Sequence, residues 1–386
     1  MRVTHVITRL CVGGAQENTI STVLGLAQKK DVKVDLISGP TIGPEGSLER
    51  LLEPFPGVLS VLPSLVRPVR PWSDLRAFSA LKKQFQKDQV DLVHTHSGKA
   101  GVVGRLAARS AGVPCIIHTI HGPSFGDFQG RVPNLVFTSA EKIAARATTH
   151  FIVVANAMRD QYLRAGIGKV EDYSRVFSGF NLAPFLNSTN DLDLRQKLGI
   201  SPEDIVIGTV ARLFELKGHD DLIDIAPALI QKHPRVKFLF VGDGALRSRF
   251  EQRITRAGLQ AQFVFTGLVK PSEVSSHIGI MDILAHLSRR EGLPRALPQA
   301  LAARKPVVAY RCDGAPEVCL ENETGFLITP GDYRSLLSSL DALCSDPLLR
   351  TRLGANGHDF VKDKFAVDVM VDSIYTLYRK LLKTNP

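Results

Sequence analysis

Residues 287–328, LSRREGLPRALPQALAARKPVVAYRCDGAPEVCLENETGFLI, are the most informative stretch of the chain. A strand ends there in polar residues, EGLP (residues 291–294) opens a helix, and KPVVAY returns as a strand. Proline is favoured in a first helical turn, where backbone amides are also free to bind an anion. An interior proline costs about 3 kcal/mol, so Pro298 predicts that the helix begins after Pro294 or kinks. The stretch therefore predicts a β-α-β unit with a ligand-binding loop.

The same alternation of short Val- and Ile-rich runs with longer amphipathic stretches extends in both directions. It predicts parallel sheets covered by helices on both faces. The expected strands of the first half are VTHVI (3–7), VKVDLIS (32–38), VDLVHTH (90–96), VPCIIHTI (113–120) and HFIVVA (150–155). Those of the second half are DIVIGTV (204–210), VKFLFVGDG (236–244), QFVFTG (262–267), DILAHLS (282–288) and KPVVAY (305–310).

These two series predict an α/β protein of two Rossmann-like, doubly wound domains. The first is expected over residues 1–182 and the second over 200–366, since the Ser-, Asn- and Asp-rich residues 183–199 are typical of a linker. An amphipathic helix with basic residues near its end is expected over 367–386. In open α/β sheets ligands bind beyond the carboxyl ends of the strands, so the loops there are expected to hold the chemistry.

Composition excludes several classes of protein. The 386 residues are 44% apolar and 22% charged, which excludes disorder and coiled coil as descriptions of the whole chain. No apolar run reaches the roughly 18 residues of a transmembrane helix, and no signal peptide is recognisable. Five cysteines without metal-ligand spacing favour a reduced, cytoplasmic location. The net charge of +10 is concentrated in residues 1–180, which carry +8, so anionic partners are expected there.

Two loops of the second half carry the strongest candidate binding groups. Arg212 and Lys217 flank a strand-to-helix loop, where a guanidinium, an ammonium and a helix N-terminus suit a diphosphate. Glu291 beside free amides suits sugar hydroxyls, and Gln299 follows eight residues later. The alternative for the basic pair is ordinary solvated residues.

In the first half, three loops or strand ends carry polar or glycine residues. The pair Gly13-Gly14 precedes a helix, but it lacks the third glycine of a dinucleotide fingerprint and also fits a plain turn. His94 and His96 alternate onto one face of a strand end, and without further ligands they indicate structural histidines rather than a metal site. His121 lies just beyond another strand, where it is either a ligand-binding or a structural histidine.

Taken together, these motifs resemble the family-four glycosyltransferases, over nearly the whole chain. The resemblance rests on six features: Gly13-Gly14, His121-Gly122, Arg212 with Lys217-Gly218, VGDG (241–244), EGLPRALPQALAARKPVVA (291–309), and GAPEV (314–318) with ETGFL (323–327). It implies the GT-B fold, in which two Rossmann-like domains face each other across a cleft. It further implies retaining transfer from a nucleoside diphosphate sugar, UDP-linked in our expectation, without a required metal or other cofactor.

The resemblance also implies residue roles. The donor diphosphate would be held by Arg212 and Lys217, with help from the amides of Gly292 and Leu293 and from the loop of Gly13 and Gly14. His121 and Glu291 would act on the donor sugar as the catalytic residues, and Gln299 would hold the nucleotide ribose. Relatives commonly have glutamate at that last position; glutamine can also bond a diol. The C-terminal helix would pack back onto the first domain.

Two other functions remain open at this stage. A nucleotide-sugar epimerase shares Rossmann-like domains, although it calls for more acid and base groups. A non-catalytic nucleotide-sugar binder is the simplest alternative and is favoured by Gln299. A nucleic-acid binder is disfavoured because the basic residues are scattered and no binding motif is present.

The segment VRPVRPWSDLRAFSALKKQFQKDQ (residues 66–89) suggests where an acceptor is presented. Its basic residues and aromatics are typical of a helix at an anionic membrane surface, and the candidates are Arg67, Arg70, Trp72, Lys82 and Lys83. We would then expect a sugar or lipid-linked acceptor, in cell-surface polysaccharide or glycolipid synthesis. We would also expect a peripheral position on the inner face of the membrane. The alternative is that Phe78 and Phe85 face the core and the lysines are merely solvated.

Overall fold

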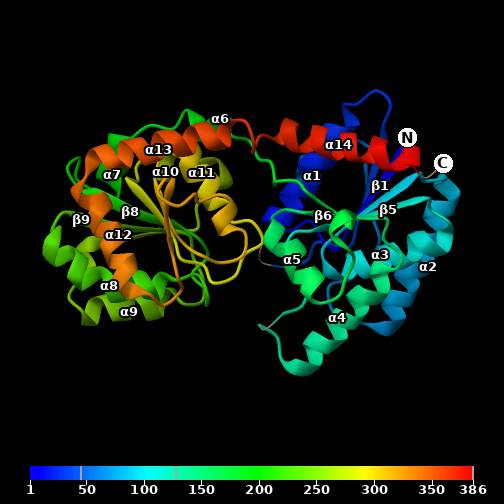
Figure 1. Cartoon of the computed structure of the whole chain (residues 1–386), viewed down its shortest axis with the longest axis horizontal. Helices are drawn as coiled ribbons and strands as arrows, with labels where there is room; N and C mark the ends of the chain where they lie inside the picture. The colour runs from blue at the N-terminus through cyan, green and yellow to red at the C-terminus, as the bar shows by residue number, and fades with distance from the viewer. Residues whose placement is uncertain (44–45, 127, 385–386) are drawn as a thin grey trace. The chain divides into compact units, whose positions relative to one another are not determined.

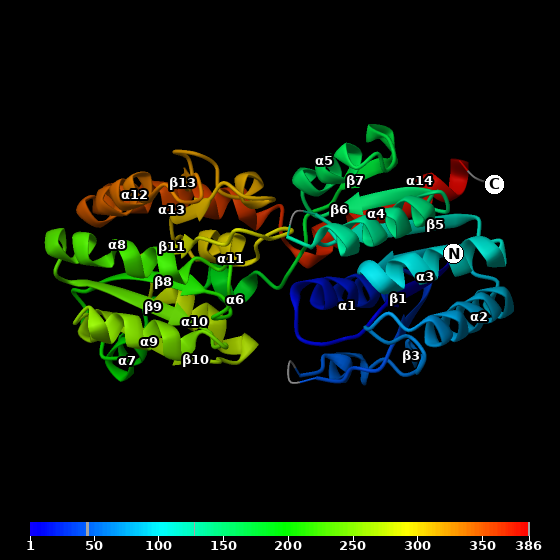
Figure 2. The ribbon, with the colours of Figure 1, turned by 90° about the horizontal axis from the view of Figure 1, so that it is seen from below.

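The computed structural model describes residues 1–43, 46–126 and 128–384. The chain divides into two compact units: unit 1 is Met1–Phe180 with Phe365–Pro386, and unit 2 is Asn181–Lys364. Each unit is a twisted sheet with helices on both faces (Figures 1 and 2).

The sheet of unit 1 has seven parallel strands in the order β3-β2-β1-β4-β5-β6-β7. The strands are β1 (Arg2–Ile7), β2 (Lys33–Ser38), β3 (Leu59–Val61), β4 (Leu92–His96), β5 (Cys115–Ile120), β6 (His150–Val153) and β7 (Tyr173–Arg175). The helices are α1 (Gly14–Ala27), α2 (Pro71–Asp88), α3 (Gly98–Ala111), α4 (Arg131–Ala145), α5 (Asn156–Arg164) and the short turns η1 (Glu49–Leu52) and η2 (Val170–Asp172). Strands β4 and β5 are buried along their whole length, although both contain polar residues. The order reverses between β1 and β4, which is where such sheets bind ligands.

The C-terminal helix α14 (Val367–Thr384) belongs to unit 1 and lies beside α1 (Figure 1). Its buried face, with Met370, Val371 and Ile374, joins the core formed by α1 and the central strands. The last two residues of the predicted helix 367–386 lie outside the described part of the chain.

Unit 2 has six parallel strands in the order β10-β9-β8-β11-β12-β13. They are β8 (Ile205–Val210), β9 (Val236–Val241), β10 (Phe263–Gly267), β11 (Ile283–His286), β12 (Val307–Tyr310) and β13 (Gly325–Ile328). The covering helices are α8 (His219–Lys232), α9 (Arg247–Arg256), α10 (Val274–Gly279), α11 (Ala296–Ala302), α12 (Tyr333–Ser345) and α13 (Pro347–Lys362), with the short turns η3 (Gln260–Gln262), η4 (Pro271–Glu273) and η5 (Ala315–Glu317). Here the order reverses between β8 and β11.

Residues 183–199, predicted as a linker, are instead a folded part of unit 2. They contain α6 (Ala183–Leu186) and α7 (Leu192–Lys197), and Asp191 caps α7 by accepting a hydrogen bond from the backbone of Leu194. Arg195 is buried and donates to the carbonyl of Ile280 at 2.9 Å and to Asp282 at 3.1 Å. Asp191, one of the residues that suggested a loop, is therefore a helix cap, and Arg195 anchors the segment to the rest of unit 2.

Helix α11 begins at Ala296, after Pro294 as the sequence predicts. Pro298 is its third residue, within the first turn, where backbone N–H groups have no partner inside the helix. The proline therefore costs the helix no hydrogen bond.

Candidate functional site

The candidate donor site lies at the switch point of unit 2, because β8 and β11 are neighbours and their following loops leave the same sheet edge. Lys217, after β8, donates to a carboxylate oxygen of Glu291, after β11. The Lys217 ammonium also lies 3.5 Å from the hydroxyl of Ser288. Nε2 of His286 is 3.7 Å from the same Glu291 oxygen. The structure thus brings together two residues that the sequence placed 74 positions apart.

The carboxylate of Glu291 is held in its charged form. Burial alone would raise its pKa, but His286, the Lys217 ammonium and the hydrogen bond from Lys217 lower the pKa below its ordinary value. Burial lowers the pKa of His286 to about 4. At neutral pH the site therefore holds a lysine-glutamate ion pair beside a neutral imidazole.

Hydrogen bonds from neighbouring loops fix the Glu291 loop. The backbone N–H of Glu291 donates to Asp313 at 2.7 Å, and the N–H of Gly314 donates to the carbonyl of Gly292 at 3.1 Å. Ser288 donates to the carbonyl of Arg290 at 3.1 Å. Sequence analysis did not single out Ser288, His286 or Asp313; the available signal was that His286 ends β11 and that Ser288 and Asp313 follow β11 and β12.

Gly218 joins the two loops by a close backbone approach. It has φ of 76° and caps α8. A Cβ atom there would lie 2.2 Å from the carbonyl oxygen of Leu287. Only glycine fits at this position, and the Lys217-Gly218 pair lies at the start of α8, as predicted. The close approach of the two loops places Lys217 beside Glu291.

The remaining predicted donor residues of unit 2 lie around this pair. Arg212 is exposed on the loop after β8, with its guanidinium 5.0 Å from the ring centre of Phe214. Within the described residues no acidic group pairs with Arg212, and none accepts from the backbone amides of Gly292 and Leu293. Gln299 is half-buried in α11. These groups are therefore available to a ligand.

Unit 1 carries the other predicted site residues at the carboxyl edge of its sheet. Gly13 caps α1 and Gly14 is its exposed first residue. The φ of Gly13 is 172°, an extended conformation open to any residue, so backbone geometry does not explain this glycine. His121 directly follows β5 and is half-buried.

His121 is hydrogen-bonded to a buried histidine. Its Nε2 lies 3.0 Å from Nδ1 of His96, and the two rings stack with centres 5.3 Å apart. Burial lowers the pKa of His121 to about 4, so it is neutral at neutral pH. The loop after it is tied down by Ser124, which donates to Glu141 at 3.0 Å, and Glu141 pairs with the buried Arg105 at 2.6 Å.

A third histidine, His5 in β1, completes a buried cluster that sequence analysis missed. Ring nitrogens of His5, His94 and His96 lie within 4.8 Å of one another, a spacing that a metal ion also accepts. All six ring nitrogens already have hydrogen-bond partners, however. The cluster is therefore a hydrogen-bonded chain, which supports the prediction of structural histidines.

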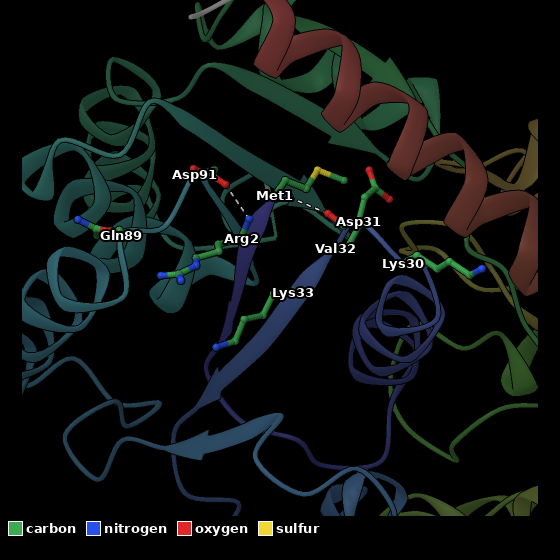
Figure 3. Close-up of a pocket in the computed structure, with 8 residues that line it drawn as sticks. All are labelled: Met1, Arg2, Lys30, Asp31, Val32, Lys33, Gln89 and Asp91. Carbon is green, nitrogen blue, oxygen red and sulfur yellow. Dashed lines mark hydrogen bonds between the residues drawn. The ribbon is translucent and has the colours of Figure 1, made fainter.

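Two surface pockets lie at the opposite edges of the sheets. A pocket of about 540 Å³ in unit 1 is lined by residues at the amino ends of β1 and β2, where Met1 donates to the carbonyl of Asp31 and the backbone of Arg2 donates to Asp91 (Figure 3). The second, in unit 2, lies at the amino ends of β8 and β9. Neither contains a predicted site residue.

The predicted membrane-surface residues lie on or before α2. Trp72 is 81% exposed, Arg67, Arg70 and Lys83 are exposed, and Lys82 is half-buried. Phe85 is buried in the core and Phe78 packs against it, as the alternative interpretation expected. The exposed apolar neighbours of Trp72 are instead Val69 and Leu75.

Helix α4 presents a second exposed apolar face that sequence analysis missed. Val132, Leu135, Val136 and Ile143 are each more than half exposed, with Arg131 and Lys142 beside them. Their spacing is helical, so the signal was present in the sequence. None of the helices in residues 1–43, 46–126 and 128–384 is long and apolar enough to cross a bilayer.

Two doubly wound units, each with polar loops at the switch point of its sheet, are the architecture of the GT-B fold. The model of the family "Glycosyltransferase Family 4" matches residues 12–178, and that of "Glycosyl transferases group 1" matches residues 190–360. The chain belongs to the family-four glycosyltransferases, as the resemblance implied.

Proteins of similar sequence and structure agree with this assignment. The chain is 28% identical, over 82% of each protein, to the Escherichia coli UDP-Gal:alpha-D-GlcNAc-diphosphoundecaprenol alpha-1,3-galactosyltransferase. It is 24% identical to the capsular polysaccharide biosynthesis glycosyltransferase CapM of Staphylococcus aureus, over 85% of this chain and 86% of that one. The crystal structure of Anabaena Alr3699/HepE in complex with UDP superposes with a TM-score of 0.83 at 25% identity, covering 98% of this chain and 100% of that one.

Proposed function

We propose that the protein transfers a sugar from a UDP-sugar to an acceptor with retention of anomeric configuration. The observation that carries the proposal is the Lys217–Glu291 pair at the switch point of unit 2. Arg212, which has no acidic partner among the described residues, lies on the same loop as Lys217. A cation pair beside a carboxylate suits a ligand that joins a diphosphate to a sugar. The similarity to a protein crystallised with UDP and with UDP-glucose supports uridine as the base.

Charge develops in two places during such a transfer. The leaving diphosphate gains negative charge, which Arg212, Lys217 and the free amides of Gly292 and Leu293 are proposed to oppose. Glu291 is proposed to bind sugar hydroxyls, His121 to contact the sugar, and Gln299 to bond the ribose. The loop of Gly13 and Gly14 is proposed to close on the phosphates or the acceptor.

Retention is proposed to occur by front-face attack, with the leaving phosphate as the base. A double displacement needs two carboxylates about 5 Å apart. Glu291 is instead committed to Lys217, and His121 is neutral and bonded to His96. The step then needs orientation and charge stabilisation from the protein rather than a covalent intermediate, and no residue is assigned to hold a metal.

The test is turnover of a panel of radiolabelled nucleotide sugars with a mixture of candidate acceptors, followed by NMR of the product. The proposal expects transfer from one UDP-sugar, with the α anomer of the donor kept in the product. An inverted product would exclude front-face attack. Sugar interconversion without transfer would indicate an epimerase, and tight binding of UDP-sugar without any turnover would indicate a non-catalytic binder.

We further propose a lipid-linked acceptor presented at an anionic membrane surface, in cell-surface polysaccharide or glycolipid synthesis. The exposed Trp72 with Arg67 and Arg70, and the exposed apolar face of α4, support this surface. Each basic residue near an anionic surface contributes about 1 kcal/mol. The similarity to an enzyme that acts on a diphosphoundecaprenol substrate points the same way.

Sedimentation with liposomes tests the membrane surface. Vesicles containing anionic lipid should carry the protein down at low salt and release it at high salt, and neutral vesicles should not. Trp72→Ala and Leu135→Ser should weaken sedimentation, whereas Leu192→Ser, at an exposed apolar residue of unit 2, serves as the control. Absence of binding to both vesicle types would favour a water-soluble acceptor.

A further inference from the structure

Unit 1 contains a continuous chain of hydrogen bonds from His121 to the C-terminal helix. In order, the bonds join His121 to His96 at 3.0 Å, His96 to His5 at 2.9 Å, His5 to Tyr378 at 3.3 Å, Tyr378 to His94, and His94 to Thr119 at 2.6 Å. Four of the five linked groups behind His121 are less than 2% exposed, and Thr119 is 3% exposed. We call this set the histidine chain.

Strand register explains why these side chains meet. His5 of β1 pairs with His94 of β4, and His96 pairs with Thr119 of β5. His94 and His96 point to the same face because side chains alternate along a strand. That face is covered by α14, whose Tyr378 lies in the same core as the residues of β1, β4 and β5 (Figure 1).

Each imidazole in the histidine chain carries one hydrogen. Burial lowers the pKa of His5 to about 3 and of His121 to about 4, and it holds the pKa values of His94 and His96 well below the ordinary range. A neutral imidazole has one donor and one acceptor nitrogen. Each bond needs one hydrogen, so the direction of any one bond fixes the direction of all the others.

Thr119 supplies that direction. Among the described residues its hydroxyl has a single partner, Nε2 of His94. If Thr119 accepted this bond, its own hydrogen would be buried without an acceptor, a loss that costs more than the bond contributes. Thr119 therefore donates, and His94 must carry its hydrogen on Nδ1.

The remaining bonds follow in sequence. Nδ1 of His94 donates to the oxygen of Tyr378, and the Tyr378 hydroxyl donates to Nε2 of His5. Nδ1 of His5 donates to Nε2 of His96, and Nδ1 of His96 donates to Nε2 of His121. His121 is left with its hydrogen on Nδ1, the nitrogen that the histidine chain does not use.

We propose that the histidine chain fixes His121 as a neutral hydrogen-bond donor, with Tyr378 and Thr119 as positioning residues. The inference rests on the proposed role of His121 at the donor sugar and makes that role specific. His121 donates through Nδ1–H to a sugar oxygen and cannot act there as a general base. A general base elsewhere in the chain is then unnecessary if the leaving phosphate takes the acceptor proton.

NMR of protein labelled with ¹⁵N-histidine tests the assignment directly, because long-range ¹H–¹⁵N correlations distinguish the two tautomers. The His121 signal is identified by its loss in His121→Asn. We expect Nδ1–H and a bare Nε2 at neutral pH. An Nε2–H tautomer in the natural protein would overturn the proposal, and so would a stoichiometric metal ion in the purified protein.

Tyr378→Phe removes the hydroxyl that links the two halves of the histidine chain and keeps the ring that packs in the core. We expect part of His121 to shift to the Nε2–H form and kcat to fall roughly 2- to 10-fold, the effect of one mispositioned hydrogen bond. Affinity for UDP, which lacks the transferred sugar, should stay unchanged. The matched control is Tyr375→Phe on the same helix, whose hydroxyl bonds Asp31 at the surface.

An unchanged His121 tautomer in Tyr378→Phe would refute the role of Tyr378. If that variant does not fold, Thr119→Val removes the terminal donor and should produce the same mixture of tautomers. The tautomer is read without substrate, so a failure of the proposed transfer reaction leaves this test intact. Conversely, an Nε2–H result would leave the transferase proposal standing.

Discussion

Glu291→Gln separates the two roles proposed for the donor site. The substitution keeps the size of the side chain and removes its negative charge. In the natural protein the carboxylate holds Lys217, and the two side chains are only 23% and 21% exposed. A diphosphate must therefore approach Lys217 against the field of a neighbouring carboxylate.

The size of the effect depends on the distance between the Glu291 carboxylate and the charge of a bound diphosphate, for which we take roughly 8–16 Å. At an effective dielectric constant near 20, one charge at roughly 8–16 Å from another interacts by about 1–2 kcal/mol. Removing the Glu291 charge should therefore tighten UDP binding roughly 5- to 30-fold. Turnover should fall roughly 10- to 100-fold, because the charge-assisted bonds to sugar hydroxyls are lost.

Calorimetric titration of UDP, with steady-state turnover of the UDP-sugar, measures both effects. Glu251→Gln makes the same charge change on the surface of α9 and serves as the control.

The effect of Glu291 depends on pH. Since the pKa of Glu291 is lowered in the folded protein, the contribution of the Glu291 carboxylate to stability is present above the ordinary pKa near 4.5 and is lost as pH falls through the lower pKa of the folded state. The difference in UDP affinity should persist from pH 5.5 to 8 and shrink in acid. Weaker UDP binding with retained turnover would refute the reasoning.

Three further substitutions test the supports of the site. Glu141→Ala leaves the fully buried Arg105 unpaired, so the free energy of unfolding in urea should fall by about 3–5 kcal/mol, and a change under 1 kcal/mol would contradict this. Gly218→Ala forces a Cβ against the Leu287 carbonyl, and UDP affinity measured by calorimetry should fall at least roughly tenfold. Gln299→Glu should keep UDP affinity within about threefold, because glutamate also bonds a ribose diol; complete loss of binding would exclude Gln299 from the ribose site.

Much of the fold was predictable because its signals are local. Val- and Ile-rich runs mark the strands, and a buried parallel sheet requires such runs on both faces. The loop residues Lys217 and Glu291 were identified because each lies between a strand and the helix that follows it, and the topology of a doubly wound sheet brings such loops together.

The sequence did not determine which side chains from distant strands and helices come into contact, because that depends on how the strands pair and the helices pack. His5, His94 and Tyr378 come from β1, β4 and α14, and no local pattern states that they touch. Phe85 shows the same limit, since an aromatic at helical spacing fits a core or a membrane face until the neighbours of α2 are known. Residues 183–199 were predicted as a linker because Ser, Asn and Asp are common both in loops and at helix N-caps, so their presence does not distinguish the two.

Calorimetric titration of UDP into Arg212→Ala/Lys217→Ala tests most directly the claim that the loop after β8 holds the donor diphosphate. Charge-assisted bonds contribute about 1.5–3 kcal/mol each, so affinity should fall at least roughly 100-fold while the fold is retained. Lys232→Ala/Lys237→Ala removes two other positive charges from unit 2, which bond Asp341 and the Ala261 carbonyl, and should leave affinity unchanged. Equal UDP affinity in the natural protein and in Arg212→Ala/Lys217→Ala would contradict the account.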